Sequence, residues 1–578
     1  MKELKGAFRF IFNEILIIFL YVFLVNTYIG NVDEKFVGDG RGYYDYLPSI
    51  FIHHDLVRKD LPLSESPEMY ARIGKTAVYV SYKDHLVNMY PCGTAVLELP
   101  FFIVTYQISK LKGDNADGYG LPFQRSIYYA ALFYLFLSLI FLKKVLKTYQ
   151  VRPGIITFCQ LLMVLATPVT IYANKEAGFS HIYSMFAITA FIYYIRSFFI
   201  FGKGRDFIVA ALLLGLILIL RQVNLMIILF VPFLAGSYMN LVKGIRSLFQ
   251  NYRILILALF CSLAVFSIQA TMWFLQTGDF LLYSYQGYGY NFLDPRFFKI
   301  LFGYRKGLFI YTPVLFLAFL SVAWFAKRKR YFLMFTWLGF FIFITYVLSS
   351  WFNWVYGASY GLRAYIDYFT VFFIPLAVLL NESNPVLRRS LIALSILTIP
   401  LNIVQTYQYR HYILHNYQMD KEKYWRVFLH LEKQFEGLFY IPLQSMEEYE
   451  QVDKRTAGDY TVLPGEDEVI FTISSSELFD FNDVSLIQVS IDNDFLKKND
   501  TRIGVIITDR DGSENLYWVR KYLIHFADDE LNSFHTGTYN FPLDPFEETS
   551  EKQLKLFCFS GREATELKNI TIRFFSKK

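Results

Sequence analysis

Charged residues are scarce in this sequence. They make up 18% of its 578 residues, whereas soluble proteins have about 25%. This scarcity excludes an ordinary soluble domain for most of the chain. The net charge of +6 does not indicate a nucleic-acid partner, because the lysines and arginines cluster in short segments between apolar runs, as membrane topology signals do.

Cysteine and histidine, the usual zinc ligands, are also rare, with four and nine residues. No zinc-ligand cluster accompanies a nucleophilic Ser or Thr, which argues against phosphoethanolamine transfer. The adjacent histidines of "HHD" (His53 to Asp55) would point about 100° apart on a helix, so we expect no metal ion there. The four cysteines are scattered and build no disulfide framework: Cys92, Cys159, Cys261 and Cys558.

Long apolar runs are the dominant feature of the sequence. Hydrophobic residues make up 54% of the chain and aromatic residues 19%. Several runs approach or exceed the roughly 20 residues that span a bilayer. We therefore predict a polytopic α-helical membrane protein with about eleven transmembrane helices, near residues 7–29, 124–146, 153–173, 181–201, 206–220, 222–242, 254–275, 306–326, 330–350, 364–380 and 391–407.

Basic residues predict which side each loop faces, because Lys and Arg gather on the cytoplasmic side. Lys2 and Lys5 precede the first span and no small-residue cleavage site follows it, so we expect an uncleaved helix with a cytoplasmic N-terminus. The other basic clusters agree only if the apolar segment 94–111 does not cross the membrane, so we expect that segment to be re-entrant or interfacial. The C-terminal tail then faces outward, as do the loops 30–123, 174–180, 276–305 and 351–363.

The chain changes character after residue 407. Residues 1–407 form the predicted transmembrane domain, and residues 408–455 are predicted as a helical connector with an amphipathic stretch at 422–435. In residues 456–578, short alternating runs such as "EVIFTIS", "LIQVSID" and "RIGVIITD" are separated by Gly, Asp, Asn and Pro. This pattern is typical of an antiparallel β-sandwich, and we predict a domain that resembles a jelly roll.

The first external loop contains "VGDGRGYYDYLP" (Val37 to Pro48) just after the first span. Its glycines allow a sharp turn and a close approach of the backbone to a ligand. Asp39 lies at the turn, where it is either a general base for an acceptor hydroxyl or a cap of the following helix. Asp45 is the alternative base. The tyrosines, with Tyr43 as a candidate for substrate contact, are expected at headgroup level on an interfacial helix.

The order of motifs along residues 1–407 resembles the GT-C class of membrane glycosyltransferases, which includes the protein O-mannosyltransferases and the aminoarabinose transferases. The first external loop closes with "YPCGTAVLELPFF", and "GFSHIYSM" and "LRQVN" are similar to Ser-His and Arg-x-x-Asn elements at outer span ends. "WFNWVYGASYGLRAYIDYF" is similar to a Trp-rich Gly-x-Ser-x-Gly-x-Arg element. One departure concerns the turn: related enzymes commonly have an Asp-Glu pair, whereas this turn has Asp39-Gly40 and the pair Asp33-Glu34 precedes it.

The resemblance implies sugar transfer outside the cytoplasm from a polyprenyl-phosphate carrier. A departing phosphate needs positive charge, and the fork of Arg matches phosphate oxygens. Arg221 is the sharpest candidate, because a charge between two apolar runs is costly and usually functional; the alternative is snorkelling in a tight outer hairpin. The full set of candidates for the donor phosphate is Arg221, Arg305, Lys306 and Arg363.

Three further residues are candidates for substrate contact. His181 would bind the donor or, alternatively, cap or pack its helix. Trp354 and Tyr360 would stack on a sugar or belong to an interfacial aromatic belt. A divalent ion is compatible with the chemistry, although no ligand pattern supports one.

We therefore predict an inverting glycosyltransferase with Asp39 as general base, in a bacterial inner membrane with its β domain in the periplasm. Its partners would be the bilayer, a polyprenyl-phosphate sugar and a glycan, lipid or protein acceptor, which the β domain would bind or position. One alternative is a transporter or flippase of lipid-linked glycans, which predicts repeated halves and charges buried at mid-bilayer; neither is evident in the sequence. Another is a structural or sensory membrane protein, which leaves the external acid and arginines unexplained.

Overall fold

The chain consists of two structural units, which are described separately. The helical unit contains Met1–Arg58 and Ala77–Glu432, and the β unit includes residues 433–578. The computed structural model describes residues 2–29, 38–56, 78–82, 85–113, 116–285, 288–417, 419–432, 435, 449–463, 467–474, 483–493, 502–509, 515–522, 535–543, 552–559 and 564–577.

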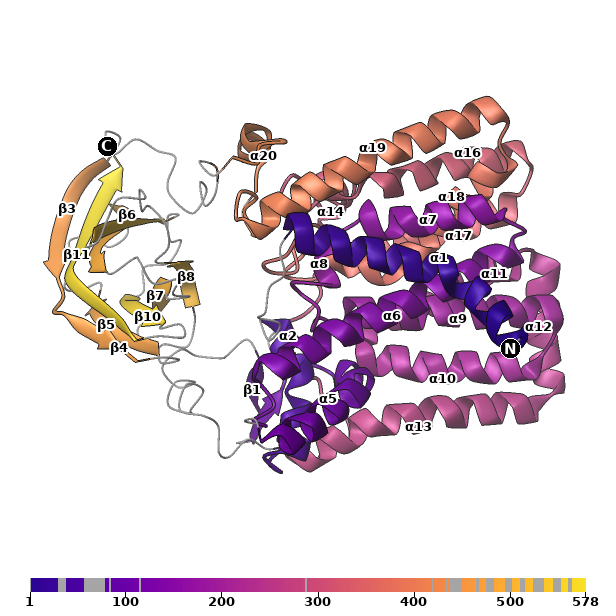
Figure 1. Cartoon of the computed structure of the whole chain (residues 1–578), viewed down its shortest axis with the longest axis horizontal. Coiled ribbons are helices and arrows are strands. Elements are labelled where there is room, and N and C mark those ends of the chain that lie inside the picture. Colours follow the sequence, from indigo (N-terminus) through magenta and orange to yellow (C-terminus); the bar gives the residue numbers. More distant parts are fainter. Residues whose placement is uncertain are drawn as a thin grey trace. The chain divides into compact units, whose positions relative to one another are not determined.

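Long helices run side by side through the helical unit (Figure 1). A backbone in lipid satisfies its hydrogen bonds within the helix, which favours long helices wherever the sequence is continuously apolar. The long helices are α1 (Lys2–Leu24, continued by the π-helical turn Val25–Ile29), α6 (Leu121–Thr148), α7 (Pro153–Leu165), α9 (His181–Phe201), α10 (Gly204–Leu220), α13 (Tyr252–Thr277), α17 (Tyr331–Ser349), α18 (Phe369–Glu382) and α19 (Pro385–Arg410). Three segments begin as 3₁₀ helix: η3 (Gln222–Phe230) leads into α11 (Val231–Ala235), η4 (Pro313–Phe319) leads into α16 (Leu320–Lys327), and η5 (Arg363–Tyr368) leads into α18.

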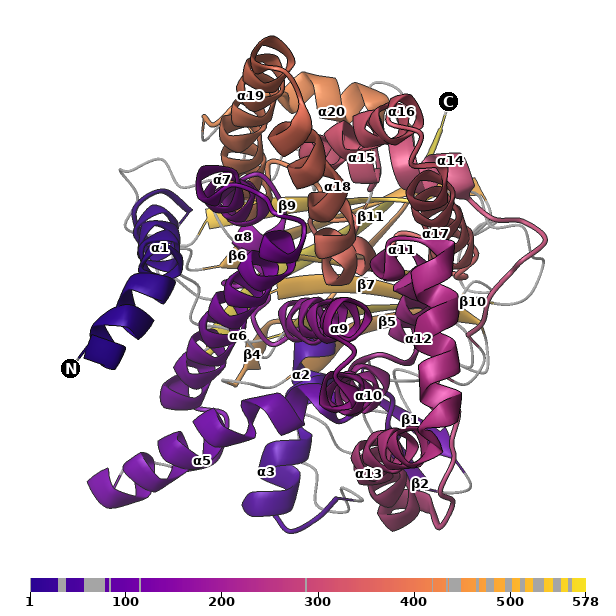
Figure 2. The same ribbon diagram turned by 90° about the vertical axis from the view of Figure 1, so that its right-hand side faces the viewer.

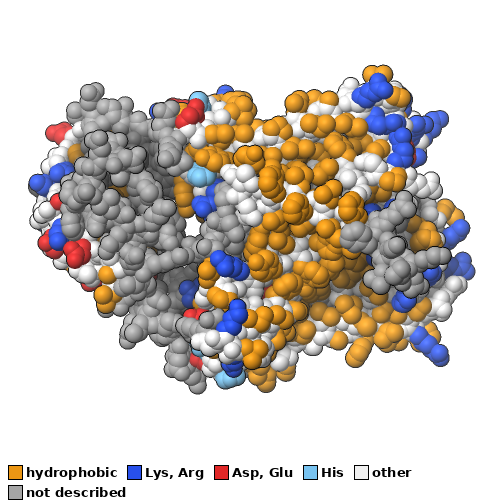
Figure 3. Space-filling view, viewed as in Figure 1, with side chains coloured by type: hydrophobic (Ala, Val, Ile, Leu, Met, Phe, Trp, Pro, Cys, Tyr) orange, Lys and Arg blue, Asp and Glu red, His pale blue; other side chains and the backbone are white. Residues whose placement is uncertain are grey.

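These helices make the first unit a multi-pass membrane domain. Among the described residues, seven helices are long and apolar enough to cross a membrane, and one bent pair is an eighth candidate. Figure 3 shows hydrophobic side chains covering the flank of this unit, with most of the visible Lys and Arg near its ends. The predicted number of about eleven spans depends in addition on three shorter segments, α7, α10 and η4 with α16, and it stays a prediction.

The predicted span 222–242 is wrong at its C-terminal end. The helix ends at Ala235, because Gly236 has a positive φ of 79° and the Ser237 hydroxyl accepts a hydrogen bond from the Asn240 backbone N–H, which starts a new helix. The chain bends by 117° between the two helices, and α12 (Tyr238–Gln250) follows. Apolar residues continue beyond the bend, so hydropathy alone extended the span too far.

Helix α5 (Gly93–Lys112) carries the apolar segment that was expected not to cross the membrane. Figure 2 looks along α9 and α10, which are seen end-on, whereas α5 is seen from its side. Among the described residues, α5 is also not one of the helices that qualify as spans. Its crosswise direction agrees with the expectation of an interfacial or re-entrant helix.

Short elements gather at the end of the helical unit that lies opposite the N-terminus (Figure 1). Most of them belong to the loops that the sequence places outside the cytoplasm. They are α2 (Asp39–Tyr44), α3 (Tyr46–Phe51), the hairpin of β1 (Tyr79–Tyr82) and β2 (His85–Asn88), α8 (Val169–Tyr172), α14 (Phe297–Phe302), α15 (Leu308–Tyr311), η5 (Arg363–Tyr368) and α20 (Lys421–Val427). This end of the unit carries the polar residues described below.

The β unit contains two antiparallel sheets around one core. One sheet has the order β5-β10-β7-β8, and the other has β3-β11-β6-β9 with β4 also paired to β11. Both sheets contribute to the core, for example through Val505 on β7 and Phe574 on β11. The strands are β3 (Tyr449–Thr456), β4 (Tyr460–Val462), β5 (Asp467–Ser474), β6 (Val484–Asn493), β7 (Arg502–Asp509), β8 (Asn515–Tyr522), β9 (His535–Pro542), β10 (Lys552–Phe559) and β11 (Thr565–Lys577).

The predicted boundaries of this region need one correction. The alternating pattern was expected from residue 456, but strand β3 already begins at Tyr449, so the end of the predicted helical connector is a strand. Of the amphipathic stretch 422–435, helix α20 covers only the part up to Val427. The connector residues 436–448 lie outside the described residues. The jelly-roll topology stays a prediction.

Candidate active site

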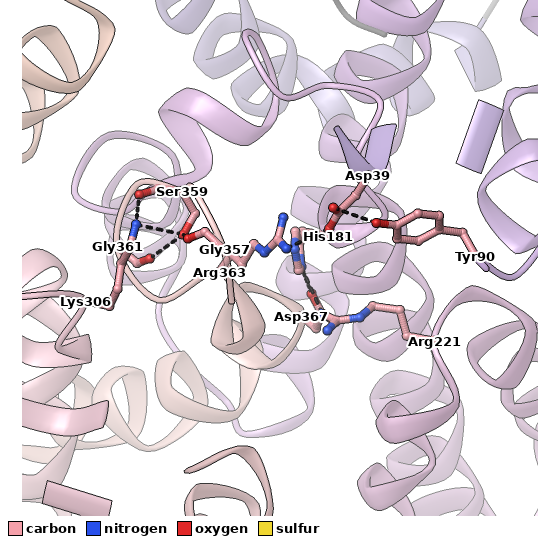
Figure 4. A network of polar contacts seen from close by, with 10 residues as sticks. All are labelled: Asp39, Tyr90, His181, Arg221, Lys306, Gly357, Ser359, Gly361, Arg363 and Asp367. Carbon is pink, nitrogen blue, oxygen red and sulfur yellow. Dashed lines mark hydrogen bonds and ion pairs between the residues drawn. The ribbon is translucent and has the colours of Figure 1, made fainter. Parts of the chain in front are cut away.

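The turn at Asp39 places a carboxylate at the edge of a charged cluster. Gly38 has a φ of 54°, a conformation that favours glycine, and Asp39 is the first residue of the short helix α2. Asp39 Oδ2 forms an ion pair with Arg363 Nη2 at 2.7 Å, and its Oδ1 accepts a hydrogen bond from the Tyr90 hydroxyl at 2.8 Å. Figure 4 shows Arg363 and Tyr90 approaching this carboxylate from different sides. The side chain therefore contacts residues far away in sequence.

Gly42 explains how Tyr90 reaches Asp39. A Cβ atom on Gly42 would lie 2.1 Å from Tyr90 Cδ2, so only glycine leaves room for the ring at this position. The ring also packs against Tyr43, with 4.8 Å between the ring centroids. Burial, and next the charge of Asp39, raise the pKa of Tyr90 well above its ordinary value. The phenol therefore stays protonated and donates to the carboxylate.

A second charged centre surrounds Asp367, which is fully buried. Its Oδ1 accepts a hydrogen bond from His181 Nδ1 at 2.8 Å. Its Oδ2 accepts from Arg221 Nη1 at 3.0 Å and from Asn224 Nδ2 at 2.7 Å. Because a carboxylate only accepts, Nδ1 of His181 carries the proton. Arg221 Nη1 and His181 Nδ1 lie 3.1 Å apart because both donate to the same carboxylate, one to each oxygen.

The two centres are joined through η5 and through Phe179. Arg363 and Asp367 lie on the same 3₁₀ helix, and the Arg363 guanidinium lies 5.1 Å from the ring centroid of Phe179. Phe179 in turn stacks on His181, with 6.4 Å between ring centroids. Figure 4 shows His181 between Arg363 and Asp367. Segments from five distant parts of the chain thus meet in one cluster.

Tyr43 belongs to this cluster, as expected. Its hydroxyl lies within electrostatic range of Arg221, Asp39 and Arg363, although burial is the largest influence and raises the pKa of Tyr43 above its usual value. Asp39, Arg221 and Arg363 keep partly exposed side chains, at 25%, 15% and 11%. Both arginines also keep N–H groups for which no hydrogen bond is present among the described residues. The cluster can therefore still donate to an anion.

Asp45 is not part of this cluster. Its side chain is fully buried, and its two oxygens accept hydrogen bonds from the hydroxyls of Tyr79 and Tyr119. These contacts tie the junction between α2 and α3 to the β1–β2 hairpin and to the loop before α6. The position suits a structural carboxylate, and the role of Asp45 as an alternative base stays a prediction.

Arg305 and Lys306 make contacts of a different kind. Arg305 Nε donates to the Tyr417 carbonyl at 2.8 Å, and its guanidinium lies over the Tyr417 ring. Lys306 is 1% exposed and donates to the Ser359 carbonyl, to Ser359 Oγ at 3.0 Å and to the Asn416 carbonyl at 2.5 Å. An ammonium has three protons to donate, so Lys306 has none left for a phosphate.

The two remaining aromatic candidates lie elsewhere in the same segment. Tyr360 is 1% exposed and packs between Tyr311 and Tyr409, and its hydroxyl donates to Asn402 Oδ1 at 3.0 Å. It is a core residue in this structure. Trp354 is half-buried in the loop before η5. Stacking of either ring on a sugar stays a prediction.

Four residues of the cluster were not singled out from the sequence. Tyr90, Asn224 and Asp367 stand inside motifs that were quoted above, but no local pattern shows that they meet Asp39 or Arg221. The fourth, Glu176, is a buried carboxylate near Arg363 and Lys306. An acid that lies between two apolar spans was the available signal for it. Asp33 and Glu34 lie outside the described residues.

A metal ion finds no evident set of ligands here. Among the residues that the structure describes, no group of three or more His, Cys, Asp or Glu could hold an ion. His53 and His54 are both exposed. Each oxygen of Asp39 already has a partner, so the positive charge beside this carboxylate is supplied by Arg363.

The chain is similar to known proteins in structure but not in sequence. No protein-family model matches the chain, and no curated protein matches its sequence. The chain is similar to the oligosaccharyltransferase of Archaeoglobus fulgidus in its apo crystal structure, with a TM-score of 0.39, 10% identity, and 74% of this chain and 60% of the archaeal chain covered. The archaeal protein in complex with Zn and sulfate gives a TM-score of 0.37 and 12% identity, with 72% and 57% covered.

This chain therefore spans about 60% of the length of the archaeal enzyme. A likeness of this size does not itself assign a function, so the proposal below depends on the site and on the sequence motifs.

Proposed function

We propose that this protein is a membrane glycosyltransferase of the GT-C type, which moves a sugar from a polyprenyl-phosphate donor to an acceptor hydroxyl. The observation that carries the proposal is the pairing of Asp39 with Arg363 at 2.7 Å, next to Arg221 held by Asp367 at 3.0 Å. A carboxylate and two arginines at one end of a bundle of membrane helices are the groups that this reaction requires. The order of the sequence motifs supports the same proposal.

The reaction would be an inverting displacement. Asp39 accepts the proton of the acceptor hydroxyl while the acceptor oxygen bonds to the anomeric carbon, and the bond from that carbon to the phosphate oxygen breaks. The phosphate leaves with the electron pair, so negative charge grows on it in the transition state. Arg221 and Arg363 would stabilise that charge, because preorganised cations in a partly buried site act strongly on a developing anion.

Asp367 and His181 would position Arg221 rather than touch the sugar. Asp367 binds one edge of the Arg221 guanidinium, which leaves the other edge for phosphate oxygens. Of the four candidates for the donor phosphate, we retain Arg221 and Arg363. Arg305 and Lys306 are engaged by backbone carbonyls and by the Ser359 hydroxyl, so we assign them to the structure of the surrounding loops.

In this scheme Arg363 interacts with two anions, the Asp39 carboxylate and the donor phosphate. Without donor it pairs with Asp39, and an arriving phosphate would compete for the same guanidinium. Donor binding would thus loosen Asp39 and make its oxygen available to the acceptor hydroxyl. Tyr90 would keep the carboxylate in place during this exchange, because its hydrogen bond goes to the other oxygen.

The proposed location follows from the topology prediction. Helix α2, which begins with Asp39, lies at the end of the helical unit opposite the N-terminus (Figure 1), and Tyr90, His181 and Arg363 lie close to Asp39 (Figure 4). With a cytoplasmic N-terminus, this end would face the periplasm of a bacterial inner membrane. The β unit would then be periplasmic and would bind or position the acceptor, which is a glycan, a lipid or a protein.

One observation favours the alternative of a transporter or flippase. Lys143 and Glu14 form a buried ion pair of 2.6 Å between α6 and α1, and charges buried inside spans are typical of transport proteins. Gln160 also donates to Glu14 at 2.6 Å, so the pair belongs to a larger hydrogen-bond network. We assign it to helix packing.

The proposal is tested by transfer of a radiolabelled sugar from polyprenyl phosphate to endogenous acceptors in membranes. Wild type, Asp39→Asn and the matched variant Asp45→Asn are compared at equal amounts of folded protein. We expect Asp39→Asn to reduce transfer by about 10²- to 10⁴-fold, the usual contribution of a general base, and Asp45→Asn to retain transfer per folded molecule. Normal transfer by Asp39→Asn would remove Asp39 from the mechanism. No transfer by wild type from mannose, glucose or N-acetylglucosamine donors would favour the flippase.

A further inference from the structure

Glu176 is a buried carboxylate that the proposed reaction does not use. It lies in the loop between α8 and α9 and is 6% exposed. Its Oε1 accepts a hydrogen bond from the Tyr409 hydroxyl at 2.6 Å. Its Oε2 is buried and makes no hydrogen bond within the described residues. A buried carboxylate oxygen without a donor is costly, which points to a ligand that would supply one.

The surroundings of Glu176 connect it to the charged cluster. The charge of Glu176 acts on Arg363 and on Lys306. The Tyr172 hydroxyl is close enough to Glu176 and to Ser359 to act on both as a side-chain hydrogen-bond neighbour, and it lies within electrostatic range of Arg363. At the distances and angles of this structure, however, neither this hydroxyl nor Glu176 Oε2 completes a hydrogen bond within the described residues. The Tyr172 ring contacts Phe179 and His181. Two buried oxygens and the face of an aromatic cluster therefore lie beside the arginine that we assign to phosphate.

These groups select the chemistry of their ligand. A carboxylate accepts hydrogen bonds, and a tyrosine hydroxyl accepts or donates them, so the ligand must bring donors. An ammonium group would be repelled by the neighbouring Arg363, whereas neutral hydroxyl groups would not. Aromatic rings next to such acceptors provide the apolar surface on which the C–H face of a sugar packs. Neutral sugar hydroxyls therefore fit better than a cation.

We propose that Glu176, with Tyr172, binds hydroxyl groups of the sugar on the lipid-linked donor and thereby contributes to the choice of sugar. This inference rests on the proposed function, because it takes Arg363 as the residue that holds the phosphate to which that sugar is attached. Tyr409 orients the carboxylate through Oε1 and leaves Oε2 to the sugar. Glu176 is a specificity residue in this scheme and takes no part in proton transfer.

The chain offers a matched control at Glu98. This residue is 1% exposed, its Oε1 accepts a hydrogen bond from the Tyr183 hydroxyl at 2.8 Å, and its Oε2 makes no hydrogen bond within the described residues. The leading charges that act on Arg363 include Glu176 but not Glu98. A Glu98→Gln change therefore reproduces the chemistry of Glu176→Gln at a site that we do not assign to the sugar.

The test measures binding of two kinds of lipid to the full-length protein in detergent by isothermal titration calorimetry. One probe is farnesyl phosphate, and the others are farnesyl phosphates that carry mannose, glucose or N-acetylglucosamine. We expect at least one sugar lipid to bind wild type more tightly than farnesyl phosphate does. Glu176→Gln should then weaken binding of that lipid by about 10- to 100-fold, the value of a hydrogen bond to a charged group, with little effect on farnesyl phosphate. Glu98→Gln should change neither affinity.

The outcomes separate this inference from the proposed function. If Glu176→Gln binds every sugar lipid as wild type does, the inference is wrong and the proposed function stands. If Glu98→Gln and Glu176→Gln weaken sugar binding equally, the effect of Glu176 is structural and the inference is also wrong. If wild type binds neither farnesyl phosphate nor its sugar esters, the proposed function fails and the inference fails with it. A loss of donor affinity without a loss of maximal transfer rate would support the assignment independently.

Discussion

The hydrogen bond from Tyr90 to Asp39 can be removed in two independent ways, which gives a sharp test of the site. Tyr90→Phe deletes the hydroxyl that donates to Asp39 Oδ1 at 2.8 Å. Gly42→Ala leaves the hydroxyl intact but places a Cβ atom 2.1 Å from Tyr90 Cδ2, so the ring must move. The hydroxyl is attached to this ring, so moving the ring and deleting the hydroxyl should both remove the hydrogen bond from Tyr90 to Asp39 Oδ1.

The expected magnitude follows from the type of bond. A hydrogen bond to a charged group contributes about 1.5–3 kcal/mol, which corresponds to a fall of roughly 10- to 150-fold in transfer rate. Each variant should therefore lose about one to two powers of ten in activity per folded molecule. The double variant should lose no more than the worse single variant, because changes that remove one shared interaction are not additive.

The assay is sugar transfer in membranes at matched amounts of folded protein, with thermal unfolding in detergent measured in parallel. Gly339→Ala is the control, because a Cβ atom on Gly339 in α17 would meet no atom within 4 Å. It should retain wild-type transfer. Unchanged transfer by Tyr90→Phe would show that this hydroxyl does not serve Asp39, and fully additive losses in the double variant would show that the two residues act separately.

The other predictions concern residues whose structural and functional roles can be separated. Asp45→Asn should lower the free energy of unfolding by about 1–3 kcal/mol, and with it the unfolding temperature, because it weakens the hydrogen bonds from two tyrosines; a loss of transfer by stably folded protein would contradict this. Glu14→Gln should destabilise the protein by about 3–5 kcal/mol, because it leaves Lys143 buried without its ion-pair partner, and a Glu14→Leu, Lys143→Leu double variant should recover stability in the same detergent unfolding assay. Lys306→Met should change the unfolding temperature more than the affinity for farnesyl phosphate, and Arg221→Met should do the reverse; the opposite pattern would return Lys306 to the phosphate site.

Local patterns in the sequence predicted the features that depend on composition and period. Continuous apolar runs predicted the long helices such as α9 and α13, because apolarity and length are sufficient to identify a helix in lipid. Alternating residues predicted strands such as β7. The Gly-rich turn just after the first span singled out Asp39, although the sequence left open whether its carboxylate is a base or a helix cap.

The features of the site that the sequence did not predict depend on contacts between distant segments of the chain. Asp367 meets His181, Arg221 and Asn224 only because three different helical segments converge, and no local pattern encodes that meeting. Lys306 and Tyr360 have the residue types of a binding site, yet both are buried in the structure by partners from other segments of the chain. The bend after Ala235 was missed because Gly236 and Ser237 interrupt a run that remains apolar on both sides.

The short helix η5 has a consequence for how this site could be redesigned. It carries Arg363, which pairs with Asp39, and Asp367, which holds Arg221, on one short stretch of backbone. Any substitution that rotates η5 to enlarge the room for a different sugar would also displace the anchor of Arg221. Changes of sugar preference are therefore easier to obtain from loops outside η5, such as the loop that carries Glu176, and a variant library should leave residues 363–368 untouched.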